Sequence, residues 1–449
     1  MPLTGLDIYK KLPKTNCKEC GFPTCLAFAM NVAAGKVGLE KCPYISEEAK
    51  AELEEVSAPP QRTVEIGVGE GALKVGGETV MFRHEKTFVN PPGIAVLITD
   101  QMDESEIEGR IRRLKELQYE RVGLTLKAEM AALKDTTGDP DRFRQLVEKV
   151  VSMDGFPLIL MSEKPEVIAE ALKVCADRKP LIYAATKENA EEMGKLAQEH
   201  GCPIVAKAES LQELPEVTKK LMDMGIRDIV LDSGARTLKD ALRDQTLIRR
   251  AALLNRFRPL GFPTIALPCE MTDDPMREAL IASALIAKYA GILVLSNFDG
   301  HILFPLLVER LNIYTDPQRP MAVSEGIYEI GNPDENSPVL ITTNFSLTYF
   351  IVSGEIENSR VPSYLLVKDT EGLSVLTAWA ADKFVAETIA PFVKKSGIEQ
   401  RVKHRKIIIP GYVARIAGEL EDELGDWEVL VGPREASNIP AYLREVWKP

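Results

Sequence analysis

Eight short apolar runs along the middle of the chain, each followed by an amphipathic helical stretch, constrain the fold most strongly. The runs are residues 94–99, 122–126, 157–161, 181–185, 204–206, 228–231, 264–267 and 292–295. Helical stretches such as 105–117, 165–176 and 275–288 lie between and after them. Alternation of this kind indicates repeated βα units around a parallel sheet. Eight units within about 220 residues predict a (β/α)8 barrel of the TIM type.

Polar residues follow the predicted barrel strands and should therefore face the functional end of the barrel. They are Asp100, Lys127, Ser162, Lys207, Asp232, Glu270 and Asn297. A pair such as Lys127 and Glu270 would suit acid–base chemistry. Any barrel rim supplies such a set, so a self-satisfied polar rim or a docking surface is the competing interpretation.

Four of the seven cysteines lie within the first 42 residues, at Cys17, Cys20, Cys25 and Cys42. Four thiolates gathered by a short loop with Gly and Pro suit a [4Fe-4S] cluster, for which four cysteine ligands are usual. Zinc is the alternative, although zinc sites commonly use two separated cysteine pairs. The stretch from Cys25 predicts a helix beneath the cluster. The other three cysteines lie in apolar surroundings and are interpreted as packing residues.

The C-terminal part predicts a second α/β domain. After the breaker-rich segment 314–320, strand-like runs occur at 339–342, 364–367, 406–409 and 427–431, with helical stretches at 373–388 and 411–423. Four such units do not close a barrel, so an open doubly wound sheet is expected. Small and hydroxyl-bearing residues follow these strands, and such loops either admit a large polar ligand or serve as ordinary turns. Neither a GxGxxG nor a GxxxxGK[ST] motif is present.

Breaks in the pattern divide the chain into four predicted parts. They are a cluster module at 1–57, a β-rich connector at 58–92 with strands at 63–66 and 79–82, the barrel at 93–315 and the C-terminal domain at 321–449. A net charge of −12 argues against nucleic acid as a partner. No apolar run reaches the roughly 18 residues of a membrane span, and no signal peptide is recognised, so a cytoplasmic protein is expected.

Three stretches together carry a resemblance to a known family. They are residues 16–25 with Lys41-Cys42-Pro43, the stretch 342–350 and the stretch 369–375. With the eight-unit barrel between them, they resemble the large (gamma) subunit family of corrinoid iron–sulfur proteins from the anaerobic acetyl-CoA (Wood–Ljungdahl) pathway of carbon fixation. The resemblance covers essentially the whole chain.

The resemblance implies a methyl carrier rather than a self-sufficient enzyme. A cobalamin-type corrinoid in the C-terminal domain would accept a methyl group on Co(I) from methyltetrahydrofolate through a methyltransferase. It would then deliver the methyl group to acetyl-CoA synthase, while the [4Fe-4S] cluster reductively reactivates Co(II). The implied partners are a small subunit that completes a heterodimer, the methyltransferase, acetyl-CoA synthase/CO dehydrogenase and a reductive activator.

The resemblance and the loop positions together select the expected corrinoid-binding residues. They are Thr342, Thr343, Asn344, Phe345, Ser346, Thr348, Tyr349, Thr370, Glu371, Gly372, Leu373, Ser374, Gly411, Tyr412, Gly432 and Pro433. No residue is assigned a catalytic role. The DxHxxG motif that supplies a histidine ligand to cobalt elsewhere is absent, since only His301 has an Asp two positions before it and no Gly follows at the required place. This fits a base-off, histidine-off corrinoid.

Three other functions stay open at this point. The barrel itself could be a pterin-dependent methyltransferase, with Asp232 and Asn297 binding the pterin. The protein could instead be a low-potential electron-transfer protein whose C-terminal domain only docks partners. A radical SAM barrel is disfavoured, because its three-cysteine loop uses other gaps and follows the first barrel strand, whereas this cysteine cluster precedes the barrel.

Overall fold

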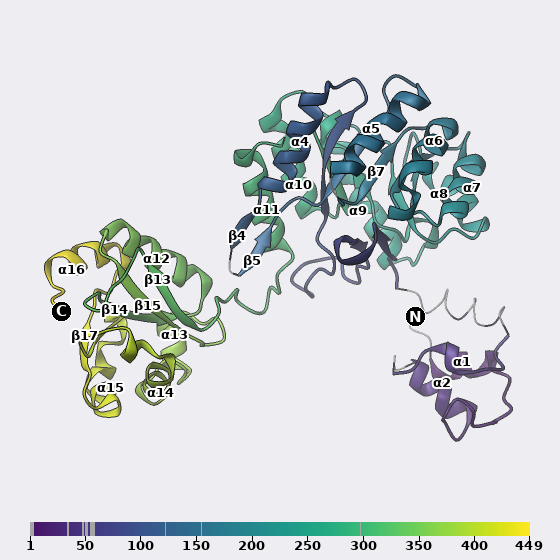
Figure 1. The fold of residues 1–449 in the computed structure, drawn as a ribbon. Helices are drawn as coiled ribbons and strands as arrows, with labels where there is room; N and C mark the ends of the chain where they lie inside the picture. The colour runs from purple at the N-terminus through teal and green to yellow at the C-terminus, as the bar shows by residue number, and fades with distance from the viewer. Residues whose placement is uncertain are drawn as a thin grey trace. The chain divides into compact units, whose positions relative to one another are not determined.

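The computed structural model describes residues 4–33, 36–46, 49, 53, 59–121, 123–153, 155–296 and 298–449 (Figure 1). Two compact units emerge. The barrel unit comprises Met1–Leu117 and Ala128–Tyr314, and the C-terminal unit comprises Gln118–Lys127 and Thr315–Pro449. The chain therefore passes between the units three times. No helix in the described ranges is both long and apolar enough to cross a bilayer.

The N-terminal module is built on two short helices, α1 (Gly5–Lys11) and α2 (Cys25–Ala33). A capping box starts α1, in which Thr4 and Asp7 exchange side-chain and backbone hydrogen bonds. The two helices share a small apolar core that includes Ile8 and Phe28. The predicted boundary at residue 57 lies outside the described residues, so the extent of this module stays a prediction.

A two-stranded antiparallel ribbon precedes the barrel. It pairs β1 (Thr63–Ile66) with β2 (Leu73–Gly76), with Val64 opposite Val75. The strand predicted at 79–82 is wrong, because β2 ends at two glycines whose φ angles, +81° and +80°, turn the chain away from the ribbon. Glu78 then accepts a hydrogen bond from the backbone N–H of Val89, which holds the following segment as a loop.

Eight parallel strands form the predicted barrel, in the order β10-β9-β8-β7-β6-β3-β12-β11. They are β3 (Gly93–Thr99), β6 (Met130–Lys134), β7 (Leu158–Met161), β8 (Leu181–Ala185), β9 (Ile204–Lys207), β10 (Ile229–Asp232), β11 (Ile265–Ala266) and β12 (Ile292–Leu295). A parallel bridge between Leu231 and Thr264 joins the two ends of this order and closes the ring. The eight-unit barrel expected from the sequence is confirmed.

Helices alternate with the barrel strands, as a (β/α)8 fold requires. They are α4 (Glu104–Glu116), α5 (Pro140–Met153), α6 (Pro165–Cys175), α7 (Ala190–His200), α8 (Leu214–Asp223), α9 (Leu238–Leu253), α10 (Pro275–Ala287) and α11 (Gly300–Ile313).

Short 3-10 turns occur in both units, at Leu39–Lys41, Gly69–Gly71, Ala176–Arg178, Arg258–Leu260, Pro268–Glu270, Ile398–Gln400, Gly411–Ile416 and Ala436–Asn438.

The barrel strand predicted at 122–126 is wrong. That run belongs to a hairpin of β4 (Tyr119–Arg121) and β5 (Leu124–Leu126), whose turn contains Gly123 with a φ of +73°. The hairpin is part of the C-terminal unit, where the Arg121 guanidinium lies 4.6 Å from the centre of the Phe350 ring. The second barrel strand is β6, and Lys127 consequently follows the hairpin instead of a barrel strand.

An open sheet organises the rest of the C-terminal unit, with strand order β13-β15-β14-β16-β17. The strands are β13 (Gly326–Ile330), β14 (Val339–Thr343), β15 (Ser363–Lys368), β16 (Lys406–Ile409) and β17 (Glu428–Val431). Four are parallel, whereas β13 is an antiparallel edge strand that the sequence analysis missed.

Helices cover both faces of this sheet (Figure 1). They are α12 (Ser346–Ser359), α13 (Val375–Ala380), α14 (Ala386–Ser396), α15 (Ala417–Leu424) and α16 (Ile439–Glu445). One apolar core joins α12 and α16 to the sheet, and another joins α14 and α15 to its opposite face. The single helix predicted at 373–388 is two helices, α13 and α14, separated by a turn in which Asp382 has a φ of +56°.

A candidate ligand cavity and a cysteine loop

The order of the C-terminal sheet locates a ligand crevice. From β14 the chain continues to β15 on one side, and it later returns to β16 on the other side of β14. Such a reversal is a topological switch point, and open α/β sheets bind ligands there, outside the carboxyl ends of the strands. The gap between β14 and β16 is therefore the place to look for a site.

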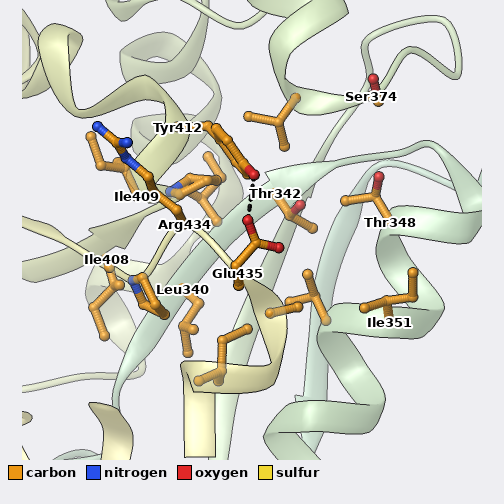
Figure 2. Close-up of a pocket in the computed structure, with 18 of the residues that line it drawn as sticks. Leu340, Thr342, Thr348, Ile351, Ser374, Ile408, Ile409, Tyr412, Arg434 and Glu435 are labelled. Carbon is orange, nitrogen blue, oxygen red and sulfur yellow. Dashed lines mark hydrogen bonds between the residues drawn. The ribbon is translucent and has the colours of Figure 1, made fainter.

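A cavity of about 340 Å³ lies at this switch point (Figure 2). Its wall is mostly apolar and comes from β14, β16, α12, the start of α13, the 3-10 turn after β16 and the segment from Gly432 to α16. The lining residues include Leu340, Ile341, Thr342, Thr348, Ile351, Val352, Ser374, Val375, Leu376, Ile408, Ile409, Pro410, Tyr412, Gly432, Pro433, Arg434, Glu435, Ala436 and Ile439. Six of these were predicted from the sequence, namely Thr342, Thr348, Ser374, Tyr412, Gly432 and Pro433.

Two of the few polar groups of the cavity are paired with each other. The Tyr412 hydroxyl donates a hydrogen bond to the Glu435 carboxylate at 2.5 Å, and this bond raises the pKa of Tyr412 (Figure 2). Thr342 differs, since its side chain is 1% exposed and its hydroxyl has no hydrogen-bond partner among the described residues. A buried hydroxyl without a partner is costly, so this wall is suited to a ligand that carries an acceptor.

Apolar side chains stand exposed where the cavity opens. Ile351 and Leu376 line it and are each 47% exposed, and Leu347 at the start of α12 is 57% exposed. Exposed apolar side chains grouped around a cavity are typical of a surface that a ligand or a partner covers.

The other predicted residues do not line the cavity. They are Thr343, Asn344, Phe345, Ser346, Tyr349, Thr370, Glu371, Gly372, Leu373 and Gly411. Several of them shape the loops that do. Asn344 joins the loop after β14 to the loop after β15, since its carbonyl oxygen accepts hydrogen bonds from the backbone N–H groups of Thr370 and Gly372, both at 3.0 Å. A Cβ at Gly411 would lie 2.5 Å from the carbonyl oxygen of Gly432, so glycine permits these two loops to meet.

Sequence reasoning missed the apolar wall of the cavity. Leu340, Ile408 and Ile439 have the pattern of ordinary core residues, and only the spatial order of the strands places them beside a cavity. Arg434 and Glu435 follow the predicted loop residues Gly432 and Pro433 directly, so extending that loop by two residues would have found them.

The four N-terminal cysteines lie in one small module. Cys20, Cys25 and Cys42 belong to the same apolar cluster, and Cys25 and Cys42 are each 7% exposed. The loop that carries three of them is tightly wound, since Asn16 and Lys18 have positive φ angles of 49° and 66°. The backbone N–H of Asn16 points at the Cys25 sulfur, 3.3 Å away, as is typical of N–H groups that stabilise metal-bound thiolates.

The seven cysteines differ in their surroundings, and none forms a disulfide. Among the described residues, no group of three or more His, Cys, Asp or Glu side chains is arranged to hold a metal ion. Burial raises the pKa of Cys175 to about 12 and that of Cys202 to about 11, which makes both poor thiolate ligands.

The carboxyl end of the barrel is a network of ion pairs. Lys134 contacts Glu270 at 2.7 Å, whereas the predicted Lys127 belongs to the C-terminal unit. Arg236 bridges Glu270 and Asp232, at 2.5 and 3.0 Å. Asp232 also accepts a hydrogen bond from the Tyr183 hydroxyl at 2.8 Å. The rim charges thus satisfy one another.

This pairing bears on the pterin alternative. Asp232 is 2% exposed and both of its oxygens accept hydrogen bonds from this chain, which leaves it poorly placed to bind a pterin. Asn297, the other residue of that hypothesis, lies outside the described residues.

Two sequence families match the chain. The family described as "CO dehydrogenase/acetyl-CoA synthase delta subunit" covers residues 63–443. The family described as "Putative Fe-S cluster" covers residues 12–44, the stretch that contains the four cysteines.

Curated relatives match over nearly the full length. The corrinoid/iron-sulfur protein large subunit of Moorella thermoacetica is 48% identical, with 99% of each chain covered. The acetyl-CoA decarbonylase/synthase complex subunit gamma of Methanothermobacter thermautotrophicus is 38% identical, again with 99% of each covered. Among solved structures, dihydropteroate synthase from Thermus thermophilus is 19% identical with a TM-score of 0.40, and it covers 57% of this chain and 100% of its own.

Proposed function

Because the chain belongs to the CO dehydrogenase/acetyl-CoA synthase delta subunit family and matches corrinoid/iron-sulfur large subunits over its full length, we propose that it is a corrinoid-dependent methyl carrier. The bound corrinoid supplies a cobalt that takes up and releases a methyl group. No residue of this chain needs to act as an acid, base or nucleophile in that role. The work of the protein is to hold the corrinoid, exclude competing ligands and present it to partners.

The switch-point cavity is the proposed corrinoid site, and the unpartnered Thr342 hydroxyl is the observation that carries the proposal. At about 340 Å³ the cavity suits one flat aromatic arm of a corrinoid, its lower base. The exposed side chains of Ile351, Leu376 and Tyr412 at its opening would be covered by the corrin ring. An apolar cavity with a few polar groups is the usual form of a cofactor site.

A base-off, histidine-off state is supported by the residues of the C-terminal unit. No histidine is among the described residues that line the cavity. His404 is committed elsewhere, since one ring nitrogen contacts the Ser337 carbonyl at 2.9 Å and the other accepts a hydrogen bond from the backbone N–H of Lys406 at 3.2 Å. His404 would therefore not be available to the corrinoid, and the cavity would hold the released lower base.

The cysteine module would hold a [4Fe-4S] cluster through Cys17, Cys20, Cys25 and Cys42. Such a cluster supplies single electrons at low potential. Cys17 and Cys20 are partly exposed, so the module is open enough to exchange electrons with a donor. A module rich in reduced cysteines suits a reducing compartment, and we expect the protein in the cytoplasm.

The proposal requires several partners. A carrier must meet a methyltransferase that loads it from a methylated tetrahydropterin such as methyltetrahydrofolate, and acetyl-CoA synthase/CO dehydrogenase, which unloads it. We also expect a small subunit that completes a heterodimer and a reductive activator. Two relatives support this expectation, since one is named as a large subunit and the other as the gamma subunit of a complex.

An anaerobic ultraviolet–visible spectrum with iron and cobalt quantified tests the proposal. About four irons and one cobalt per chain are expected, with a sharp Co(I) band appearing after a low-potential reductant is added. Iron without cobalt, even after reconstitution with a corrinoid, would refute the methyl-carrier function and favour an electron-transfer protein.

A further inference from the structure

The hydroxyl of Thr342 is the one lining group of the corrinoid cavity that is both deeply buried and unpartnered. Ser374 pairs with Thr377 at 3.0 Å, and Tyr412 pairs with Glu435. Thr348 is half-buried on α12, where water can reach it. Thr342 sits on β14 with 1% exposure, and its Oγ1 has no partner in the described part of the chain.

The wall around Thr342 offers little that could satisfy this hydroxyl. Leu340 precedes it on the same face of β14, and Ile351 and Ile408 are among the other apolar side chains that line the cavity (Figure 2). Such a slot favours a flat aromatic group, and the hydroxyl adds one directional donor to it. A ligand with an acceptor would be preferred over one without, because only the first removes the cost of the unpaired hydroxyl.

A base-off corrinoid carries a hydrogen-bond acceptor that lacks a donor. When its lower base leaves cobalt, the ring nitrogen that had bound the metal keeps a free lone pair. Burial of that lone pair in an apolar cavity is unfavourable unless a donor meets it. Thr342 supplies a donor and the released nitrogen an acceptor, so each group satisfies the other.

We propose that the Thr342 hydroxyl donates a hydrogen bond to the ring nitrogen of the corrinoid lower base, and that it thereby selects nitrogen-containing lower bases over phenolic ones. This inference rests on the proposed function, since it concerns the same cavity. It assigns Thr342 as a specificity-determining residue and the benzimidazole or purine class as the preferred base.

Two corrinoids that share the same corrin ring and differ in the lower base test the inference. One carries 5,6-dimethylbenzimidazole and the other p-cresol, which lacks a ring nitrogen. Their Kd values for corrinoid-free protein are measured by spectrophotometric titration, for the unchanged chain and for Thr342→Val, Thr342→Ser and the control Thr343→Val. The hydroxyl of Thr343 is also buried and without a partner among the described residues, but Thr343 does not line the cavity. The cost of releasing the benzimidazole from cobalt is the same for every variant, so it cancels when the Kd ratios are compared.

Thr342→Val should weaken binding of the benzimidazole corrinoid roughly tenfold, equivalent to about 1.4 kcal/mol, and leave binding of the cresol corrinoid nearly unchanged. Thr342→Ser should keep the preference, since it keeps the donor, and Thr343→Val should keep it as well. Because serine needs no extra space, this variant stays informative even if Thr342→Val folds poorly.

Equal effects of Thr342→Val on both corrinoids, or none on either, would overturn the inference and leave the corrinoid-binding function intact. Loss of the preference in Thr342→Ser would also overturn it. Failure of the unchanged chain to bind either corrinoid would instead refute the proposed function, so the two failures are distinguishable.

Discussion

The side-chain oxygen of Asn344 accepts hydrogen bonds from both the backbone N–H and the hydroxyl of Thr370, each at 3.0 Å. Its amide group donates to Asp369 at 2.8 Å, so a single side chain that is 4% exposed joins the loops after β14 and β15. Thr342 lies on β14 just before the first of these loops, and the second loop carries Ser374 to the cavity, so Asn344 acts as a positioning residue for the cavity.

Replacement of Asn344 by Ala should loosen the cavity without unfolding the barrel. It leaves buried donors unpaired, so the free energy of unfolding of the C-terminal unit should fall by about 1–3 kcal/mol, with weaker corrinoid binding. Tryptophan fluorescence can follow the unfolding of the C-terminal unit, because this unit contains all three tryptophans, Trp379, Trp427 and Trp447. The exposed Asn336→Ala is the control, and equal effects in the two variants would contradict the role assigned to Asn344.

Removal of any one cluster cysteine should abolish the iron–sulfur cluster. Cys17→Ala, Cys20→Ala, Cys25→Ala and Cys42→Ala should each lower the iron content from about four atoms per chain to a small fraction of that value. Cys202→Ala is the control, since that thiol is buried and its pKa is raised. Iron content and the visible absorption are the measurements, and a full iron complement in any of the four variants would remove that cysteine from the ligand set.

The C-terminal unit should lose stability as pH falls through the range of histidine titration. Burial lowers the pKa of His404 below its ordinary value of 6.5. The unfolded chain therefore binds a proton more readily than the folded one, and protonation would break the bond from the Lys406 N–H. This contribution is fully present above about pH 6.5 and is lost as pH falls below that value.

Fluorescence-monitored melting at about pH 7.5 and about pH 5.5 checks this contribution of His404. In His404→Asn the side-chain oxygen can accept the Lys406 N–H and does not titrate, so its Tm should fall less between the two pH values than that of the unchanged chain. The exposed His200→Asn in the barrel unit serves as control. A decrease in His404→Asn as large as in the control would show that His404 is not responsible.

The barrel rim should affect stability and not methyl transfer. Burial would raise the pKa of Glu270, but Lys134 and Arg236 outweigh it and the pKa is lowered. Glu270→Gln leaves both cations with a weaker partner and should destabilise the barrel unit by about 1–3 kcal/mol. Unfolding followed by far-UV circular dichroism measures this loss of stability. The control is Glu148→Gln, which changes the exposed carboxylate of an ion pair with Arg144. Loss of methyl uptake in a folded, corrinoid-loaded Glu270→Gln protein would reveal a catalytic rim instead.

The barrel could be predicted because its strands are short, apolar and buried on both faces. The one misplaced strand shows the limit of that reasoning. The run 122–126 contains β-branched and leucine residues and looks more like a strand than Met130–Lys134, which contains two alanines and a lysine. A positive φ at Gly123 makes the first run a hairpin, and neighbouring strands on both sides make the second a barrel strand.

Only some of the residues that line the cavity could be predicted from the sequence. The predicted residues were chosen as small or hydroxyl-bearing residues near strand ends, which is a local property, and six of them do line the cavity. Its apolar wall depends on β14 and β16 becoming neighbours, and that pairing joins segments far apart along the chain. Whether Thr342 has a partner is likewise a property of the packed molecule, which no local pattern contains.

The hairpin of β4 and β5 has a consequence for biosynthesis. Translation delivers it inside the barrel segment, whereas the sheet of its own unit emerges only after that segment. A two-stranded ribbon alone is marginally stable, so the hairpin gains its contact with Phe350 only after the barrel segment has been translated. Expression of residues 315–449 alone would leave the C-terminal unit without one of its parts.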